Sequence, residues 1–136
     1  MMVVMSTKRL DNTIILIVDD DPDIVSSVDL ALRSEGAETR TAADGNAAVG
    51  AMAADEVDAV VLDMMLPKRS GFLVLEKIKQ MDDPPVVIMV TANQGRRHMA
   101  YAETLGVDDY MTKPVPLQRL VDRIVALLDS PAETSS

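Results

Sequence analysis

Acidic residues follow two apolar segments of this chain, and they are the residues whose types and spacing could do chemistry. Asp19 and Asp20 come directly after the apolar run Ile14–Val18. Asp63 ends a second run, Val57–Asp63. The length and β-branched content of both runs favour strands that are buried on both faces, as in a parallel sheet beneath helices. The carboxyl ends of such strands meet at one edge, where ligands bind, so the sequence predicts that three carboxylates converge there.

Two further strand ends carry groups that complement these acids. Thr91 ends the apolar run 86–90, and Lys113 follows the short segment 108–111. Oxygen ligands without His or Cys suit a hard cation such as Mg²⁺, and like charges so close together need a counter-charge. A carboxylate nucleophile, a hard divalent cation, a lysine and a hydroxyl are the parts that phosphoryl transfer needs. We therefore interpret Asp63 as a phosphoryl acceptor.

Composition limits the other functions that this chain could have. Its 136 residues predict one domain. The formal net charge of −9 argues against direct binding to nucleic acid or to an anionic membrane. The absence of Cys and the presence of one His exclude thiolate chemistry and a multi-histidine metal site. The apolar start Met1–Met5 is too short for a signal peptide or a membrane span, so we expect a cytoplasmic protein.

Strand and helix patterns alternate five times along the chain, which predicts a doubly wound α/β fold with a parallel sheet and helices on both faces. Asp21 and Ser70 are the predicted N-caps of the first and third helices. We expect a flexible leader over residues 1–11, one domain over 12–129 and a disordered tail over 130–136. The expected strands are 14–18, 38–42, 57–63, 86–90 and 108–111, and the expected helices begin at Pro22, Ala47, Phe72, Arg96 and Leu117.

Over about residues 12–129 the sequence resembles the receiver domain of two-component response regulators. Four segments carry the resemblance: Ile17–Pro22, Asp63 with Met65–Pro67 and Gly71–Phe72, Val90–Ala92, and Asp109–Pro114. The resemblance implies a (βα)5 flavodoxin-like fold with a five-stranded sheet in the order 2-1-3-4-5. It also implies that Asp63 takes a phosphoryl group from a sensor histidine kinase or a phosphotransfer protein. The chain would then be no enzyme beyond catalysing its own phosphorylation and dephosphorylation.

The resemblance also implies a metal site. Mg²⁺ would bind to Asp20, Asp63 and the backbone carbonyl of Met65, with Asp19 acting mainly through bound water. Thr91, Ala92 and Lys113 would contact the phosphoryl group.

The same resemblance implies a switch and a control of its lifetime. The Lys113–Pro114 bond would be cis, and Thr91 and Tyr110 would be the switch pair. Met65 and Asn93 would flank the phosphoryl group. The two positions act in opposite directions, because Asn93 can orient a water in line with phosphorus and the apolar Met65 cannot. Met65 follows Asp63 most closely, so we expect it to dominate and the phosphorylated form to be comparatively long-lived.

The expected signalling face is the fourth helix, fifth strand and fifth helix, which would contact a downstream protein. Asp108, Asp109 and Arg123 fit the charged dimer face of receivers from the winged-helix transcription-factor group. Arg119, however, is basic where that group usually has an acid, and a like-charge contact disfavours pairing. We therefore predict a monomer or a weak, phosphorylation-dependent homodimer. Lys68–Ser70 is also basic where Gly, Asp or Asn are frequent, which bears on the choice of partner.

Two alternative functions stay open. One is an inactive receiver that serves as a protein-docking module. The other is a phosphatase similar to the haloacid dehalogenase superfamily, but Asp19–Asp23 lacks the Thr of the Asp-x-Asp-x-Thr motif of those enzymes. A flavodoxin is excluded because acids, not a Ser/Thr/Gly-rich phosphate loop, follow the first strand.

Overall fold

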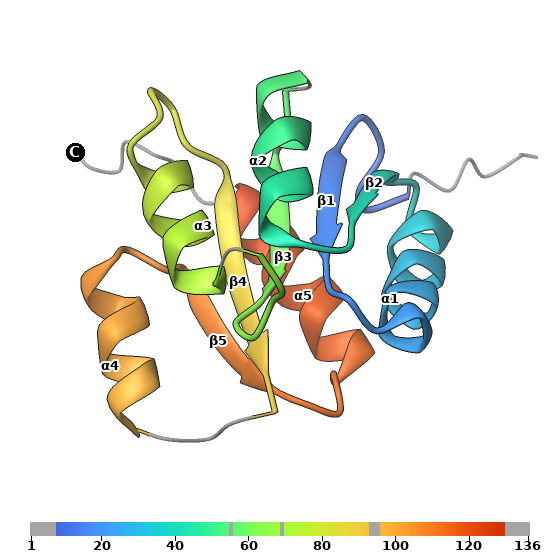
Figure 1. The fold of residues 1–136 in the computed structure, drawn as a ribbon. Helices are drawn as coiled ribbons and strands as arrows, with labels where there is room; N and C mark the ends of the chain where they lie inside the picture. Colours follow the sequence, from blue (N-terminus) through green and yellow to red (C-terminus); the bar gives the residue numbers. More distant parts are fainter. Residues whose placement is uncertain (1–7, 55, 69, 93–95, 130–136) are drawn as a thin grey trace, which may run out of the picture.

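Five parallel strands alternate with five helices in the part of the chain that the structure, a computed structural model, describes: residues 8–54, 56–68, 70–92 and 96–129 (Figure 1). The sheet order is β2-β1-β3-β4-β5, which confirms the predicted flavodoxin-like fold. The strands are β1 (Ile14–Val18), β2 (Glu38–Ala42), β3 (Ala59–Asp63), β4 (Val86–Thr91) and β5 (Asp109–Thr112). The helices are α1 (Pro22–Ser34), α2 (Gly45–Ala54), α3 (Gly71–Lys79), α4 (Arg96–Thr104) and α5 (Leu117–Asp129).

The sheet separates two hydrophobic cores, because successive residues of a strand point to opposite faces. Ile15 and Ile17 of β1 belong to the core beneath α1 and α5, whereas Leu16 and Val18 belong to the core beneath α2, α3 and α4. All residues of β3 are buried. This central strand is therefore held from both faces, and it fixes the position of the residue at its carboxyl end, Asp63.

Several predicted boundaries differ from the structure by one or two residues, and for three of them the structure shows the cause. β3 begins at Ala59, not Val57, because the Asp58 carboxylate accepts from the Ile14 N–H at 2.8 Å and ties the segment before β3 to the start of β1. α2 begins at Gly45, within the predicted turn, because the Asp44 side chain accepts from the Ala47 N–H at 2.8 Å as an N-cap does.

The third boundary is the start of β5, which is Asp109 because the Asp108 carboxylate instead accepts from the Val87 N–H of β4 at 2.8 Å. Both predicted N-caps are confirmed, since Asp21 accepts from the Asp23 N–H and Ser70 from the Leu73 N–H.

The chain is already packed before the predicted start of the domain. Leu10 is 1% exposed in the core beneath α1 and α5, and its N–H donates to the Glu35 carbonyl at 2.8 Å. Residues 1–7 and 130–136, most of the predicted leader and all of the predicted tail, lie outside the described residues. Among the helices that the structure describes, none has the length and apolar character needed to cross a membrane.

Candidate functional site

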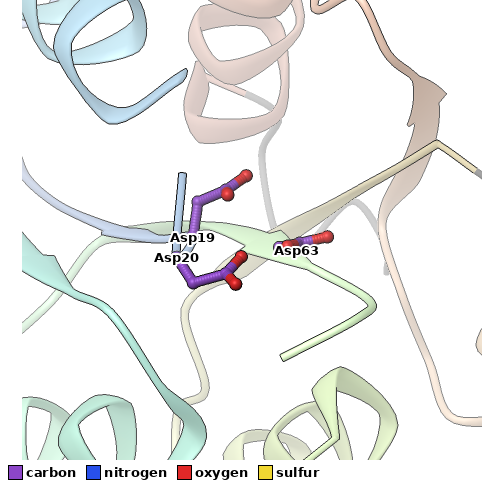
Figure 2. Close-up of side chains that lie close together, drawn as sticks. All are labelled: Asp19, Asp20 and Asp63. Carbon is purple, nitrogen blue, oxygen red and sulfur yellow. The ribbon is translucent and has the colours of Figure 1, made fainter. Parts of the chain in front are cut away.

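Three carboxylates gather at the edge where the strands end, which we call the carboxyl edge. One oxygen from each of Asp19, Asp20 and Asp63 lies within 4.8 Å of the others. Asp19 and Asp20 follow β1 and Asp63 ends the adjacent strand β3, so the parallel pairing of these strands places the three acids together (Figure 2). Asp19 and Asp63 are each 4% exposed, whereas Asp20 faces solvent.

Lys113 supplies a positive charge to this cluster. Its Nζ lies 2.9 Å from Asp19 Oδ2 and 3.6 Å from Asp63 Oδ2. Burial lowers the pKa of Lys113, but the hydrogen bond to Asp19 and the charge of Asp63 outweigh burial, so the pKa is raised overall. The backbone N–H of Lys113 donates to the Thr91 carbonyl at 2.8 Å, and the Lys113–Pro114 bond is cis. Lys113 is therefore fixed as an ammonium beside two of the acids.

The two acids after β1 have different environments. Asp19 accepts from the Asp21 N–H at 2.9 Å through Oδ1 and contacts Lys113 through Oδ2. The Asp20 side chain has no hydrogen bond or ion pair with any residue that the structure describes. Asp19 is thus committed to protein partners, and Asp20 keeps its oxygens available to a ligand.

The surroundings of Asp63 disfavour its ionisation. Burial raises its pKa to about 6, and the charges of Asp19 and Asp20 act in the same direction. The Met65 N–H, 3.2 Å from Asp63 Oδ1, and the ammonium of Lys113 oppose the shift without cancelling it. One lysine does not offset three carboxylates here, so a divalent cation held by carboxylate oxygens fits the site.

The predicted switch residues contact each other. Thr91 is fully buried, and Tyr110 is half-buried with its hydroxyl 3.9 Å from Met64 Sδ. Burial raises the pKa of the Tyr110 phenol, and a hydrogen bond with Thr91 opposes this rise. The ring therefore already packs against the core next to Thr91 and Met64.

Of the other predicted site residues, Met65 and Ala92 lie at or near the same edge. The Met65 side chain, two residues after Asp63, is 63% exposed, and Ala92 is exposed after Thr91. Asn93 lies outside the described residues.

The predicted dimer residues Asp108, Asp109 and Arg123 make ion pairs within the chain. Asp109 pairs with Arg123 at 2.8 Å, and Asp108 pairs with Lys79 at 2.8 Å. Arg119 is exposed on α5.

Two features of the segment that joins β3 to the start of α3 were not predicted as parts of the site. A Cβ at Gly71 would lie 2.4 Å from the Asp63 carbonyl oxygen and 2.7 Å from Met64 Cα, so only glycine allows α3 to begin against the end of β3. Lys68 has a φ of 70° and its Nζ lies 3.7 Å from Asp44 Oδ2, joining this loop to the start of α2. The unusual basic residue at position 68 was the available sequence signal for a special role of this loop, although residue types alone do not reveal the backbone conformation.

The chain is similar to curated transcriptional regulatory proteins. It is 40% identical over 114 residues to the probable transcriptional regulatory protein TcrX of Mycobacterium tuberculosis, covering 84% of this chain and 49% of that protein. It is 37% identical over 123 residues to the transcriptional regulatory protein PrrA of the same species, covering 90% of this chain and 52% of that protein. The chain thus spans about half the length of these curated relatives.

Solved structures match the whole of the fold. A CheY-like response regulator receiver domain protein from Methanospirillum hungatei superposes with a TM-score of 0.84 at 29% identity, covering 90% of this chain and 98% of that one. The CheX–CheY–BeF3–Mg²⁺ complex from Borrelia burgdorferi matches with a TM-score of 0.83 at 27% identity, covering 92% and 100%.

The sequence family described as the response regulator receiver domain matches residues 15–125, most of the chain. The strand order, the acids at the carboxyl edge and this match agree with one another. This chain therefore belongs to the response regulator receiver domain family of two-component systems.

Proposed function

We propose that this chain is a phosphorylation-dependent switch in which Asp63 accepts a phosphoryl group from the phosphohistidine of a sensor kinase or a phosphotransfer protein. The observation that carries the proposal is the convergence of Asp19, Asp20 and Asp63 within 4.8 Å, with Lys113 3.6 Å from the Asp63 carboxylate. This arrangement combines a nucleophilic oxygen with a fixed positive charge at a ligand-binding edge.

The proposed step uses the Asp63 carboxylate as a nucleophile. Its oxygen attacks phosphorus, the phosphorus–nitrogen bond to imidazole breaks, and the electron pair of that bond stays on the nitrogen. A pKa of about 6 leaves Asp63 mainly ionised at neutral pH, so the nucleophile is available. The Lys113 ammonium lies where it can offset charge on the transferring oxygens.

Mg²⁺ fits the donor set of the site, since three carboxylates face one lysine and Asp63 has a raised pKa. Asp20, Asp63 and the Met65 carbonyl would hold the ion, with Asp19 acting through water. The ion would supply charge neutralisation during phosphoryl transfer. Asp20 is the side chain best placed for this role, because it is exposed and makes no hydrogen bond or ion pair with a described residue.

The output would run through the switch pair and the α4–β5–α5 face to a downstream protein. Thr91 and Tyr110 already interact, so drawing the threonine hydroxyl to a phosphoryl group would change the packing of the tyrosine ring. Because the curated relatives are transcriptional regulatory proteins and this chain has a net charge of −9, contact with DNA would fall to another domain or protein. The setting would be the cytoplasm, where sensor kinases present their phosphohistidine.

The proposal is tested by incubating the purified protein with Mg²⁺ and a phosphorylated histidine kinase or an acyl phosphate, followed by mass spectrometry. We expect one added phosphoryl group on Asp63 and none in Asp63→Asn. Asp82→Asn, which removes an exposed acid at the opposite edge, is the matched control and should be phosphorylated normally. Absence of any phosphoryl group would favour the inactive docking module, and labelling of Asp19 or Asp20 would favour the phosphatase alternative.

A further inference from the structure

A groove lies between α2 and α3 at the edge where the strands begin, which we call the amino edge. Two adjoining hollows of about 310 and 490 Å³ form this groove, and they share Met52, Ala53 and Met81. The last turn of α2 and the loop after α3 rise together at the top of Figure 1, whereas the carboxyl edge lies at the bottom. The groove is thus far from Asp63 and is not part of the site described above.

The floor of this α2–α3 groove is apolar and adaptable. Met52 and Ile78 are buried and contribute to the core, and Met81 is 40% exposed after α3. Ala53 is an exposed residue between the two hollows, so the centre of the groove is shallow. Methionine side chains repack around different apolar partners, which suits a site for a side-chain stripe on another protein.

The rim of the groove is acidic at the end nearest the strands. Glu56 follows α2, and Asp82 and Asp83 form the turn after α3; all three are exposed and line the larger hollow. Their side chains have no hydrogen bond or ion pair with any residue that the structure describes. Asp58 also lines this hollow, but its carboxylate accepts a hydrogen bond from the Ile14 N–H. Lys77 lies at the other end of the groove.

An apolar floor with unpaired acids along one rim has a specific complement. We propose that the α2–α3 groove docks a basic amphipathic helix of a partner protein. An apolar stripe on such a helix would lie on Met52, Ala53 and Met81, following the helix-in-groove mode. Lysine or arginine residues on one flank would face Glu56, Asp82 and Asp83, where charge complementarity sets register and speeds encounter.

The charge of the rim decides between possible occupants. An anionic membrane or nucleic acid would be repelled by Glu56, Asp82 and Asp83, and a purely apolar ligand would leave these acids unused. Because the groove and Asp63 lie at opposite ends of β3, docking would leave the phosphoryl-acceptor site open. The partner could then remain bound whether or not Asp63 is phosphorylated.

The test measures binding of a fluorescein-labelled helical peptide of about 16 residues, with leucines along one face and lysines on one flank. Fluorescence anisotropy with the full chain gives the Kd, and amide shifts in NMR spectra locate the peptide. We expect micromolar binding and the largest shifts at Met52, Ala53, Ile78 and Met81. The double variant Asp82→Asn/Asp83→Asn should weaken binding about tenfold, and added salt should reduce that difference.

A matched pair of charge removals controls for bulk electrostatics. Asp23→Asn/Glu103→Gln removes two exposed acids from α1 and α4 and should change the Kd less than about twofold. Ala53→Arg should block the floor of the groove and so prevent peptide binding, and circular dichroism checks that this variant is folded. If it is not folded, comparison of the Kd values of the two double charge variants decides. The proposal is overturned if both double variants lose the same peptide affinity, or if the largest amide shifts fall outside the groove. It is also overturned if the peptide does not bind, or if a glutamate-flanked peptide binds equally well.

Discussion

The two edges of the sheet use acidic residues in opposite ways. At the carboxyl edge, Asp19 and Asp63 are 4% exposed and Lys113 contacts both. At the amino edge, Asp82 and Asp83 are exposed and unpaired with any described residue. Buried like charges interact strongly and shift one another's pKa, whereas solvated charges act mainly on approaching partners. This difference supports the two proposals, phosphoryl transfer at the carboxyl edge and docking of a partner at the amino edge.

A substitution in the closely packed backbone of the carboxyl edge should have the largest effect on stability. In Gly71→Ala the new Cβ would lie 2.4 Å from the Asp63 carbonyl oxygen, so backbone must move. We expect a loss of about 3 kcal/mol in the free energy of unfolding, because overpacking against backbone is poorly relieved. Urea denaturation measures it.

Gly50 of α2, the helix that leads to the amino edge, provides the matched control. A Cβ at Gly50 meets no atom within 4 Å. Gly50→Ala should therefore stabilise the protein by about 0.5–1 kcal/mol through helix propensity. Equal effects at positions 50 and 71 would contradict the tight packing assigned to the carboxyl edge.

Removing one acid from each edge should affect stability differently. Folding raises the pKa of Asp63 from 3.8 to about 6, so the folded protein holds that proton more tightly than the unfolded chain. The ionised carboxylate therefore costs stability, and this cost appears as pH rises from about 4 to about 6. In EDTA at neutral pH, Asp63→Asn should be more stable by about 1–2 kcal/mol, since solvent at the open edge screens part of the repulsion.

The titration of Asp63 also predicts how the stability gain of Asp63→Asn depends on pH, and Asp82→Asn serves as the control. Below about pH 4 the gain in Asp63→Asn should vanish, because the wild-type carboxyl is then protonated in both states. Asp82→Asn, a change in an exposed acid, should stay within about 0.5 kcal/mol of wild type at every pH. A pH-independent gain in Asp63→Asn would show that repulsion is not its cause.

Much of the carboxyl edge could be predicted from the sequence, because each part is local. An apolar run followed by Asp19 and Asp20, or ending in Asp63, marks the end of a buried strand, and parallel topology brings such ends together. The start of α2 was missed because Asp44–Gly45 is equally typical of a turn and of a capped helix. The start of β3 was missed because the contact of Asp58 with Ile14 joins distant segments.

The amino edge illustrates what a sequence does not reveal. Its groove combines Met52 of α2, Ile78 of α3 and Asp82 of the following turn. None of these residues stands out in the sequence: Met52 and Ile78 each belong to the apolar pattern of their own helix, and Asp82 is one exposed acid among many. Their juxtaposition depends on how α2 and α3 pack against the sheet, which no local pattern encodes.

Mg²⁺ should stabilise the carboxyl edge by linkage. At an ion concentration tenfold above its Kd, the expected gain is about 1.4 kcal/mol, seen as a rise in Tm. Asp20→Ala should remove the gain, because Asp20 offers the exposed, uncommitted carboxylate of the cluster. Asp83→Asn should retain it. An undiminished rise in Tm in Asp20→Ala would place the metal elsewhere.

Non-glycine residues with a positive φ occur at both edges, and Lys68 at the carboxyl edge and Asp83 at the amino edge differ in how well their residue types tolerate this conformation. Lys68 has a φ of 70° and Asp83 a φ of 55°. Asp adopts this conformation readily, but Lys does not. Lys68→Gly should therefore raise the free energy of unfolding by about 0.5 kcal/mol, after loss of its exposed pair with Asp44, which is worth little. Asp83→Gly should be close to neutral, and urea denaturation of both variants checks the difference.

The smallest expected effect concerns how long a phosphoryl group would stay on Asp63. Hydrolysis needs a water in line with phosphorus, and Met65, two residues after Asp63, is 63% exposed at this edge without a hydrogen-bonding group of useful strength. Met65→Asn would supply an amide that can hold such a water, so we expect a rate of phosphate loss a few times faster. The measurement is the first-order loss of phosphate from purified phosphorylated protein. Met65→Leu is the control, because it keeps an apolar chain and should match wild type. If Met65→Asn loses phosphate no faster than Met65→Leu, access of water to Asp63 is not limited at position 65.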